Sequence, residues 1–216
     1  MPQSTFLNLP EEKRQKILEC ALDEFAAHDY DSASISKIVA RAGIAKGSLY
    51  QYFVDKSDLH AYLLELASQK KAEMLAAATP PKPDAALFDS LRWLFEEMAK
   101  FELLYPQLAK VGYRAAYGKS PLPESLIAKG RQATLQYFIR LIEQGKQRGE
   151  IRSEIDSSAA AFIFTAAVTH MGDFLASRAG VDAVEIAEQG SYPVHSPAVR
   201  QMYDQIIAIF QFGMAK

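Results

Sequence analysis

Residues 34–56 read SISKIVARAGIAKGSLYQYFVDK, and this stretch predicts two short helices joined by a tight turn. Ser34 is a good N-cap for a short helix that Gly43 ends, because glycine readily takes the positive φ found at helix C-termini. Aliphatic side chains then recur at a spacing that would lock two short helices together: Ile38, Ala42, Ile44 and Leu49. This pattern is typical of a helix-turn-helix, whose second helix enters the major groove of DNA. On spacing alone, an αα-hairpin without a DNA role stays open.

Apolar residues recur at helical spacing almost everywhere outside this stretch, which predicts an all-α chain. Asn8 is available to cap the first helix and Asp84 a later one, while Asp55 followed by Asp58 resembles a capping box. The proline-rich stretch at 79–83 predicts a boundary between a small N-terminal unit and a larger C-terminal one. The further helices are expected at about 9–28, 55–78, from 84 onwards, 106–117, 124–148, 156–177 and 197–214.

The composition is that of an ordinary globular protein, with 216 residues, 49% of them hydrophobic, and a net charge of -2. Cys20 is the single cysteine, which excludes an intramolecular disulfide and a thiolate metal cluster and favours a reducing compartment. The N-terminus has no signal-peptide pattern, and no apolar stretch is long enough for a bilayer. We therefore expect a cytoplasmic protein that does not bind membranes.

The charge is unevenly distributed along the chain. Residues 1–33 carry three basic and seven acidic side chains, whereas residues 34–56 carry four basic side chains and one acidic side chain. A locally basic stretch is either a nucleic-acid footprint or a solvated face. The charge is therefore compatible with the helix-turn-helix interpretation but does not decide it.

Two adjacent segments, KILECALDEFAAHDYDSAS (16–34) and ISKIVARAGIAKGSLYQYFVDKSDLH (35–60), closely resemble the DNA-binding domain of the TetR family of bacterial transcriptional regulators. The similarity covers about residues 11–66, and the residues beyond resemble the family only in being helical and of suitable length. Val39 stands where the family usually has alanine, and Ala45 where it usually has serine. The resemblance implies three parts: a three-helix helix-turn-helix DNA-binding domain (1–56), a connecting helix (57–78) and a helical effector-binding and dimerisation domain (79–216).

The resemblance also implies which side chains meet DNA. Lys46, Gly47 and Ser48 would open the recognition helix and reach base edges, while Lys56 would hold a backbone phosphate. Tyr50 has an alternative role in the core. The full expected set is Ser36, Lys37, Lys46, Gly47, Ser48, Tyr50, Tyr52 and Lys56.

The C-terminal part is dense in aromatic residues, which are either core or the walls of a small-molecule pocket. His170 has the alternative of a hydrogen-bonded core histidine. The expected pocket residues are Trp93, Met98, Phe101, Tyr113, Tyr117, Phe138, Thr169, His170 and Phe174. The last two long helices are expected to form the interface of a two-fold homodimer, through Ala159, Ala166, Met202, Ile206 and Phe210.

The expected function is a sequence-specific DNA-binding regulator. By analogy with the family it is a repressor, released from a palindromic operator by a small apolar or aromatic effector, and it needs neither a cofactor nor a metal ion. The alternatives are an effector-independent architectural DNA-binding protein and a small helical enzyme. Catalysis is disfavoured because no GxSxG, HExxH, P-loop or GxGxxG motif occurs and the histidines have no metal-ligand spacing.

Overall fold

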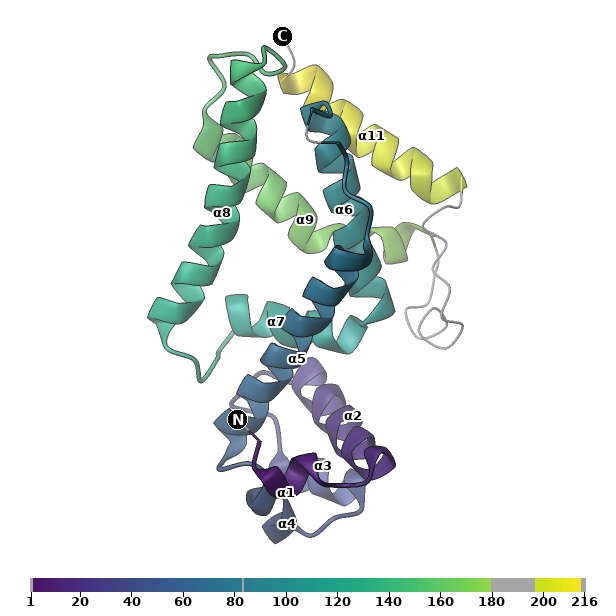
Figure 1. Cartoon of the computed structure of the whole chain (residues 1–216), viewed down its shortest axis with the longest axis vertical. Coiled ribbons are helices and arrows are strands. Elements are labelled where there is room, and N and C mark those ends of the chain that lie inside the picture. Colours follow the sequence, from purple (N-terminus) through teal and green to yellow (C-terminus); the bar gives the residue numbers. More distant parts are fainter. Residues whose placement is uncertain (1, 83, 180–196, 215–216) are drawn as a thin grey trace. The chain divides into compact units, whose positions relative to one another are not determined.

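The computed structural model describes residues 2–82, 84–179 and 197–214, and every regular element in these ranges is a helix (Figure 1). The prediction of an all-α chain is confirmed. The helices are α1 (Ser4–Leu7), α2 (Glu11–Ala27), α3 (Ile35–Ala42), α4 (Lys46–Tyr52), α5 (Lys56–Ala77), α6 (Leu87–Leu104), α7 (Pro106–Tyr117), α8 (Glu124–Gln147), α9 (Ser157–Ala179) and α11 (Pro197–Met214). None of the helices described is long and apolar enough to cross a lipid bilayer.

The chain forms two compact units that are interleaved in sequence. Unit 1 contains the residues up to Glu73 together with Gln107–Ala128, and unit 2 contains Met74–Pro106 together with the residues from Lys129 onwards. This division differs from a boundary placed at the prolines of 79–83, because α7 belongs to the same unit as the helix-turn-helix.

Several helix ends form as the local sequence predicts. The Ser34 hydroxyl accepts a hydrogen bond from the Lys37 amide at 3.4 Å, and Gly43 ends α3 with φ 68°. Asp55 Oδ1 accepts from the Asp58 amide at 2.8 Å, while Asp58 Oδ2 accepts from the Val54 amide at 3.0 Å. This reciprocal pair is a capping box in which the second carboxylate reaches one residue further back.

Two other caps differ from the prediction. Asn8 does not cap α2, whose N-cap position is held by Pro10 without a side-chain hydrogen bond. Asp84 does not cap α6, which begins at Leu87; there Glu150 Oε2 accepts the Leu87 amide at 2.5 Å. A carboxylate 63 positions away in the chain has replaced the local cap. The short helix α1 was not predicted, because four residues are too few to show a period.

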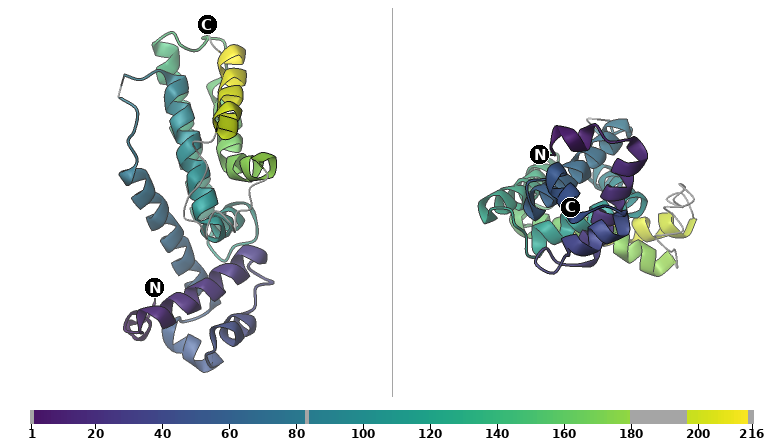
Figure 2. Two further views of the ribbon diagram at one scale, coloured as in Figure 1. Left: turned by 90° about the vertical axis from the view of Figure 1, so that its right-hand side faces the viewer. Right: turned by 90° about the horizontal axis from the view of Figure 1, so that it is seen from below.

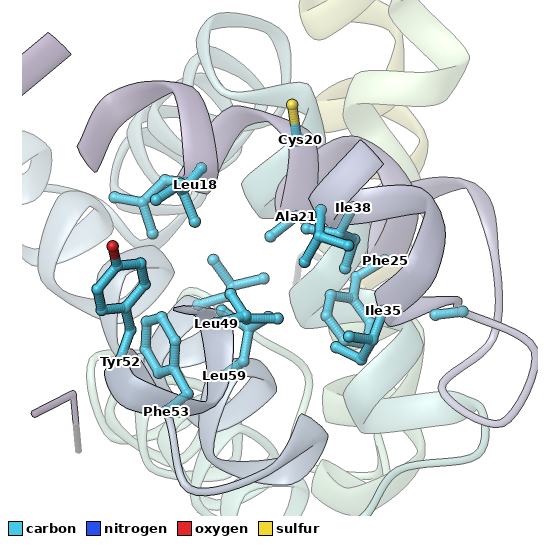
Figure 3. Close-up of a cluster of buried hydrophobic side chains, with 14 of the residues drawn as sticks. Leu18, Cys20, Ala21, Phe25, Ile35, Ile38, Leu49, Tyr52, Phe53 and Leu59 are labelled. Atoms are coloured by element: carbon cyan, nitrogen blue, oxygen red, sulfur yellow. The ribbon is translucent and has the colours of Figure 1, made fainter. Parts of the chain in front are cut away.

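The core of unit 1 joins α2, α3, α4 and the start of α5 (Figure 3). Leu49 of α4, Phe25 of α2 and Leu59 of α5 belong to this cluster, and all three side chains are at most 2% exposed (Figure 3). Val111 of α7 is part of the same cluster and is fully buried. The Ser34 amide also donates to the buried carboxylate of Glu24 at 2.9 Å, which ties the start of α3 to α2.

Unit 2 is built around α6, α9 and α11, which pack against one another, and α8 covers the same core (Figures 1 and 2). The rings of Phe138 and Phe164 lie 6.0 Å apart, and Phe210 meets Phe164 edge to face at 4.8 Å. Arg92 of α6 also pairs with Asp204 of α11. Aromatic packing thus holds the helices of unit 2 together.

Candidate nucleic-acid interface

Helices α3 and α4 pack into the core of unit 1 through apolar side chains on one face of each helix. Their opposite faces are exposed. Ile38 is fully buried and Leu49 is 2% exposed. Ser36 and Lys37 of α3 and Lys46 and Gly47 of α4 are all exposed. These exposed positions lie at the two helix N-termini, where backbone N–H groups and a positive dipole end favour anions.

Lys46 and Ser36 connect the two helices at their exposed surface. The Lys46 ammonium donates to the Ser36 hydroxyl at 3.5 Å. Helix α4 begins at Lys46, and its N-cap residue, Ala45, makes no side-chain hydrogen bond to it. The start of α4 therefore presents a cation and uncapped amides together.

The two tyrosines of α4 have different environments. Tyr50 is 46% exposed, which agrees with a contact to DNA, whereas Tyr52 is 7% exposed and its ring lies 5.8 Å from that of Phe6. The Tyr52 carbonyl also accepts from the Gln3 amide at 2.8 Å. Tyr52 thus anchors α1 on α4, a contact that the sequence pattern did not reveal because α1 itself was missed.

Lys56 lies in the first turn of α5 and is partly exposed. Its ammonium donates to the Asp31 carbonyl at 3.3 Å and lies 4.6 Å from the centroid of the Tyr30 ring. Tyr30 and Asp31 belong to the loop between α2 and α3. The side chain expected to hold a phosphate is therefore tethered to this loop.

His60 lies one turn after Lys56 on α5, and its side chain is buried. It is 3% exposed, and its Nδ1 has no hydrogen-bond partner. Burial, helped by the neighbouring Lys56 charge, lowers the pKa of His60 from 6.5 to about 4. The imidazole is therefore neutral at neutral pH and adds no cation to the surface.

The residues expected to form an effector pocket are divided between the two units. Tyr113 and Tyr117 lie on α7 in unit 1, are both exposed and have ring centroids 5.0 Å apart. The other seven lie in unit 2. Phe138, Met98 and Phe101 are buried, Trp93 and Thr169 are partly buried, and His170 and Phe174 are exposed.

The residues expected at a dimer interface also differ in exposure. Ala159 and Ala166 are exposed on α9, whereas Met202, Ile206 and Phe210 of α11 are half-buried against the core of unit 2. More prominent apolar side chains lie exposed on the same helices: Phe162, Ile163, Ile209 and Phe212, at 68%, 50%, 72% and 83% exposed. Their helical spacing was visible, but only packing shows which side of each helix is uncovered.

In the part of the chain that the structure describes, acidic side chains, histidines and the cysteine do not gather into a metal site. Within 2–82, 84–179 and 197–214 no group of three such residues is placed to hold an ion.

Comparison with known proteins agrees with the geometry. Residues 17–63 match the model of bacterial regulatory proteins of the tetR family, and residues 85–215 match a tetracyclin repressor-like C-terminal domain. The chain is 29% identical to the HTH-type transcriptional repressor SCO4008 of Streptomyces coelicolor, over 73% of this chain and 77% of that protein. It is 26% identical to the HTH-type transcriptional repressor BepR of Brucella suis, over 80% and 85%.

A solved structure gives the same result at the level of the fold. A TetR family transcriptional regulator from Chloroflexus aurantiacus is 40% identical and superposes with a TM-score of 0.93, covering 100% of this chain and 99% of that one. Both parts of the chain are therefore similar to the corresponding parts of known regulators.

Proposed function

The chain belongs to the TetR family of bacterial DNA-binding transcriptional regulators, and we propose that it acts in the cytoplasm as a repressor whose operator binding a small effector abolishes. The family consists of regulators and not enzymes. The observation that carries the proposal is the exposed face of α3 and α4, where Ser36, Lys37, Lys46 and Gly47 lie at two neighbouring helix N-termini, of which that of α4 has no side-chain cap. Two of the similar proteins bear the name of transcriptional repressor, which supports repression here.

The exposed and partly exposed residues divide into two proposed kinds of DNA contact. Lys46, Gly47 and Ser48 at the start of α4 would read base edges, because the N-terminal residues of a recognition helix enter the groove. Ser36, Lys37, Tyr50 and Lys56 would bind phosphates, which position the protein without reading sequence. Since Tyr52 is buried against Phe6, we assign it to holding α1 rather than to DNA.

DNA from the region upstream of the protein's own gene tests these assignments. Lys56→Ala should weaken binding to this fragment and to unrelated duplexes alike, and should make the slope of log affinity against log salt shallower by about one unit. Lys46→Ala should instead change the preference between sequences, by about 1–3 kcal/mol for a good base contact. Lys129→Ala, which removes an exposed lysine of α8 in unit 2, is the control and should change neither. Unchanged binding by both lysine variants of unit 1 would refute the interface.

We further propose that the protein is a homodimer joined through α9 and α11. Ala159, Phe162, Ala166 and His170 follow one another at three or four residues, so they form one exposed stripe on α9. Ile209 and Phe212 give α11 a similar exposed side. Because one short recognition helix covers few base pairs, two copies on a palindrome would supply the missing specificity.

An apolar or aromatic effector is the proposed signal, bound within unit 2. Met98 and Phe101 of α6 and Phe138 of α8 supply buried apolar surface, which suits such a ligand. Trp93 is the single tryptophan of the chain and lies on α6, so tryptophan fluorescence reports on this helix. A panel of small aromatic compounds should contain one that changes Trp93 emission and releases operator DNA over the same concentration range. Release without any change at Trp93 would place the effector elsewhere.

A further inference from the structure

A group of four side chains surrounds the start of α5 in unit 1. Lys56 lies over the ring of Tyr30, with 4.6 Å from its Nζ to the ring centroid, and also donates to the Asp31 carbonyl at 3.3 Å. An ammonium over an aromatic face is attracted by the negative face of the ring. The loop between α2 and α3 therefore holds the ammonium by two contacts, one polar and one aromatic.

The Tyr30 ring is itself held in place. It stacks on Phe25 at 6.2 Å with an interplanar angle of 11°, and His60 meets it edge-on at 5.3 Å and 70°. Phe25 and His60 also contact each other at 5.0 Å, and both are almost fully buried. Two rigid rings from α2 and α5 thus fix the plane of a third, which belongs to a loop.

The titratable side chains next to Lys56 are either neutral or bound to other partners. His60 is kept neutral by burial, with its pKa lowered to about 4, so it does not repel the ammonium one turn away. The Asp31 carboxylate pairs with Lys119 at 3.3 Å rather than with Lys56, and the Asp55 carboxylate accepts from Ser57 and Asp58. A lysine ammonium has three N–H donors, and two of its directions are taken by the carbonyl and the ring. The third remains for an external acceptor.

We propose that Tyr30 is a positioning residue for DNA binding: its ring holds the Lys56 ammonium so that the remaining donor meets a backbone phosphate. The inference rests on the proposed phosphate contact of Lys56. An unrestrained lysine side chain loses rotamer freedom when it grips a phosphate, and a lysine already held over a ring has less to lose. Tyr30 therefore contributes to affinity without touching DNA, and equally for all sequences.

The test compares Tyr30→Phe, Tyr30→Leu, Lys56→Ala and the double variant Tyr30→Leu/Lys56→Ala in the full chain. The probe is a mixed-sequence DNA duplex, whose dissociation constant is measured over a range of salt concentrations. Tyr30→Leu should weaken binding by about 2- to 5-fold, the size of an exposed cation–π contact, whereas Tyr30→Phe keeps the ring and should retain affinity. The double variant should bind no more weakly than Lys56→Ala alone, because Tyr30 acts through that lysine.

A nuclear magnetic resonance measurement separates positioning from a loss of folding. The ring should shift the Lys56 side-chain ε-methylene protons upfield in the native protein and in Tyr30→Phe, and Tyr30→Leu should abolish the shift while the rest of the spectrum is retained. Additive losses in the double variant, or full affinity of Tyr30→Leu, would overturn the inference. If Lys56→Ala itself binds like the native protein, the proposed phosphate contact fails first, and that result is distinct from a failure of Tyr30 alone.

Discussion

His60 shows how packing decides the protonation of a single residue. Burial lowers the pKa of His60 to about 4, whereas the unfolded chain takes up its proton near 6.5. The unfolded state thus binds more protons between these two values, so the stability contributed by the neutral imidazole is complete above about pH 6.5 and is lost as the pH falls toward 4. Urea unfolding should show a loss on the order of 1–3 kcal/mol over this interval. His60→Leu should flatten the pH dependence, while His28→Gln, which changes a more exposed histidine, should keep it.

Gly43 and Gly47 give opposite expectations although a methyl group would meet no atom within 4 Å at either. Gly43 has φ 68°, so Gly43→Ala should destabilise the fold by about 1–2 kcal/mol through backbone strain alone.

Gly47 lies inside α4, where alanine should stabilise the fold by up to about 1 kcal/mol. The same Gly47→Ala should weaken operator binding, because at the proposed interface the added methyl group would lie between α4 and the base edges. Thermal unfolding and DNA titration of both variants check this, and tight DNA binding by Gly47→Ala would move the close approach away from this glycine.

Among the elements, α7 contacts the end of α2 through Arg114 in addition to the buried Val111. Arg114 donates to the carbonyls of Ala26 and Ala27 at 3.0 and 3.3 Å and pairs with Asp29 at 2.5 Å. These are the carbonyls that the end of a helix leaves without partners, and an arginine there also suits the negative end of the helix dipole. The guanidinium thus serves as a C-terminal cap supplied from 88 positions away.

Removing this cap should loosen the end of α2. Arg114→Met keeps an apolar stem and should lower the stability of unit 1 by about 1–3 kcal/mol, because hydrogen bonds to a charged group are lost. Hydrogen exchange of the amides near residue 28 should accelerate. Lys119→Met removes a more exposed ion pair to Asp31 and should cost under about 1 kcal/mol. Equal effects of the two variants would show that the Arg114 contacts are no stronger than a surface pair.

For the whole molecule, the exposed fraction of each side chain shows which residues can be changed to test dimerisation. Phe210 was expected at the interface, but its ring packs against Phe95 and Phe164, so a charge there would damage the core of unit 2 itself. Ile209 and Phe212 are largely exposed, and a charge on either should leave the protomer folded.

Ile209→Glu and Phe212→Glu should therefore give folded monomers with weakened operator binding, because each would place a charge in an apolar contact between copies. The operator itself should be a palindrome whose half-sites lie roughly 34 Å apart or a multiple of it. Sedimentation equilibrium measures the assembly, and Gln211→Glu, on the exposed residue between them in sequence order, is the charge control. A dimer that persists in both variants would require another interface.

The longer helices, the helix-turn-helix and the family resemblance can be read from the sequence, because they depend on signals a few residues apart. Ser34, Gly43 and the Asp55 and Asp58 pair act on their own backbone neighbours, so their roles can be read from spacing. The same locality explains why the exposed positions of α3 and the start of α4 were found: the apolar period that buries Ile38 and Leu49 leaves the other side open.

The residues that come together from distant parts of the chain are seen only in the folded structure. It buried Tyr52 under Phe6, capped α6 with Glu150, joined α7 to unit 1 through Val111 and Arg114, and packed Phe210 against the core of unit 2. Spacing shows that a helix has an apolar side but not which partner covers it. That choice depends on the shapes and burial of surfaces far apart in sequence, which exist together only once the chain has folded.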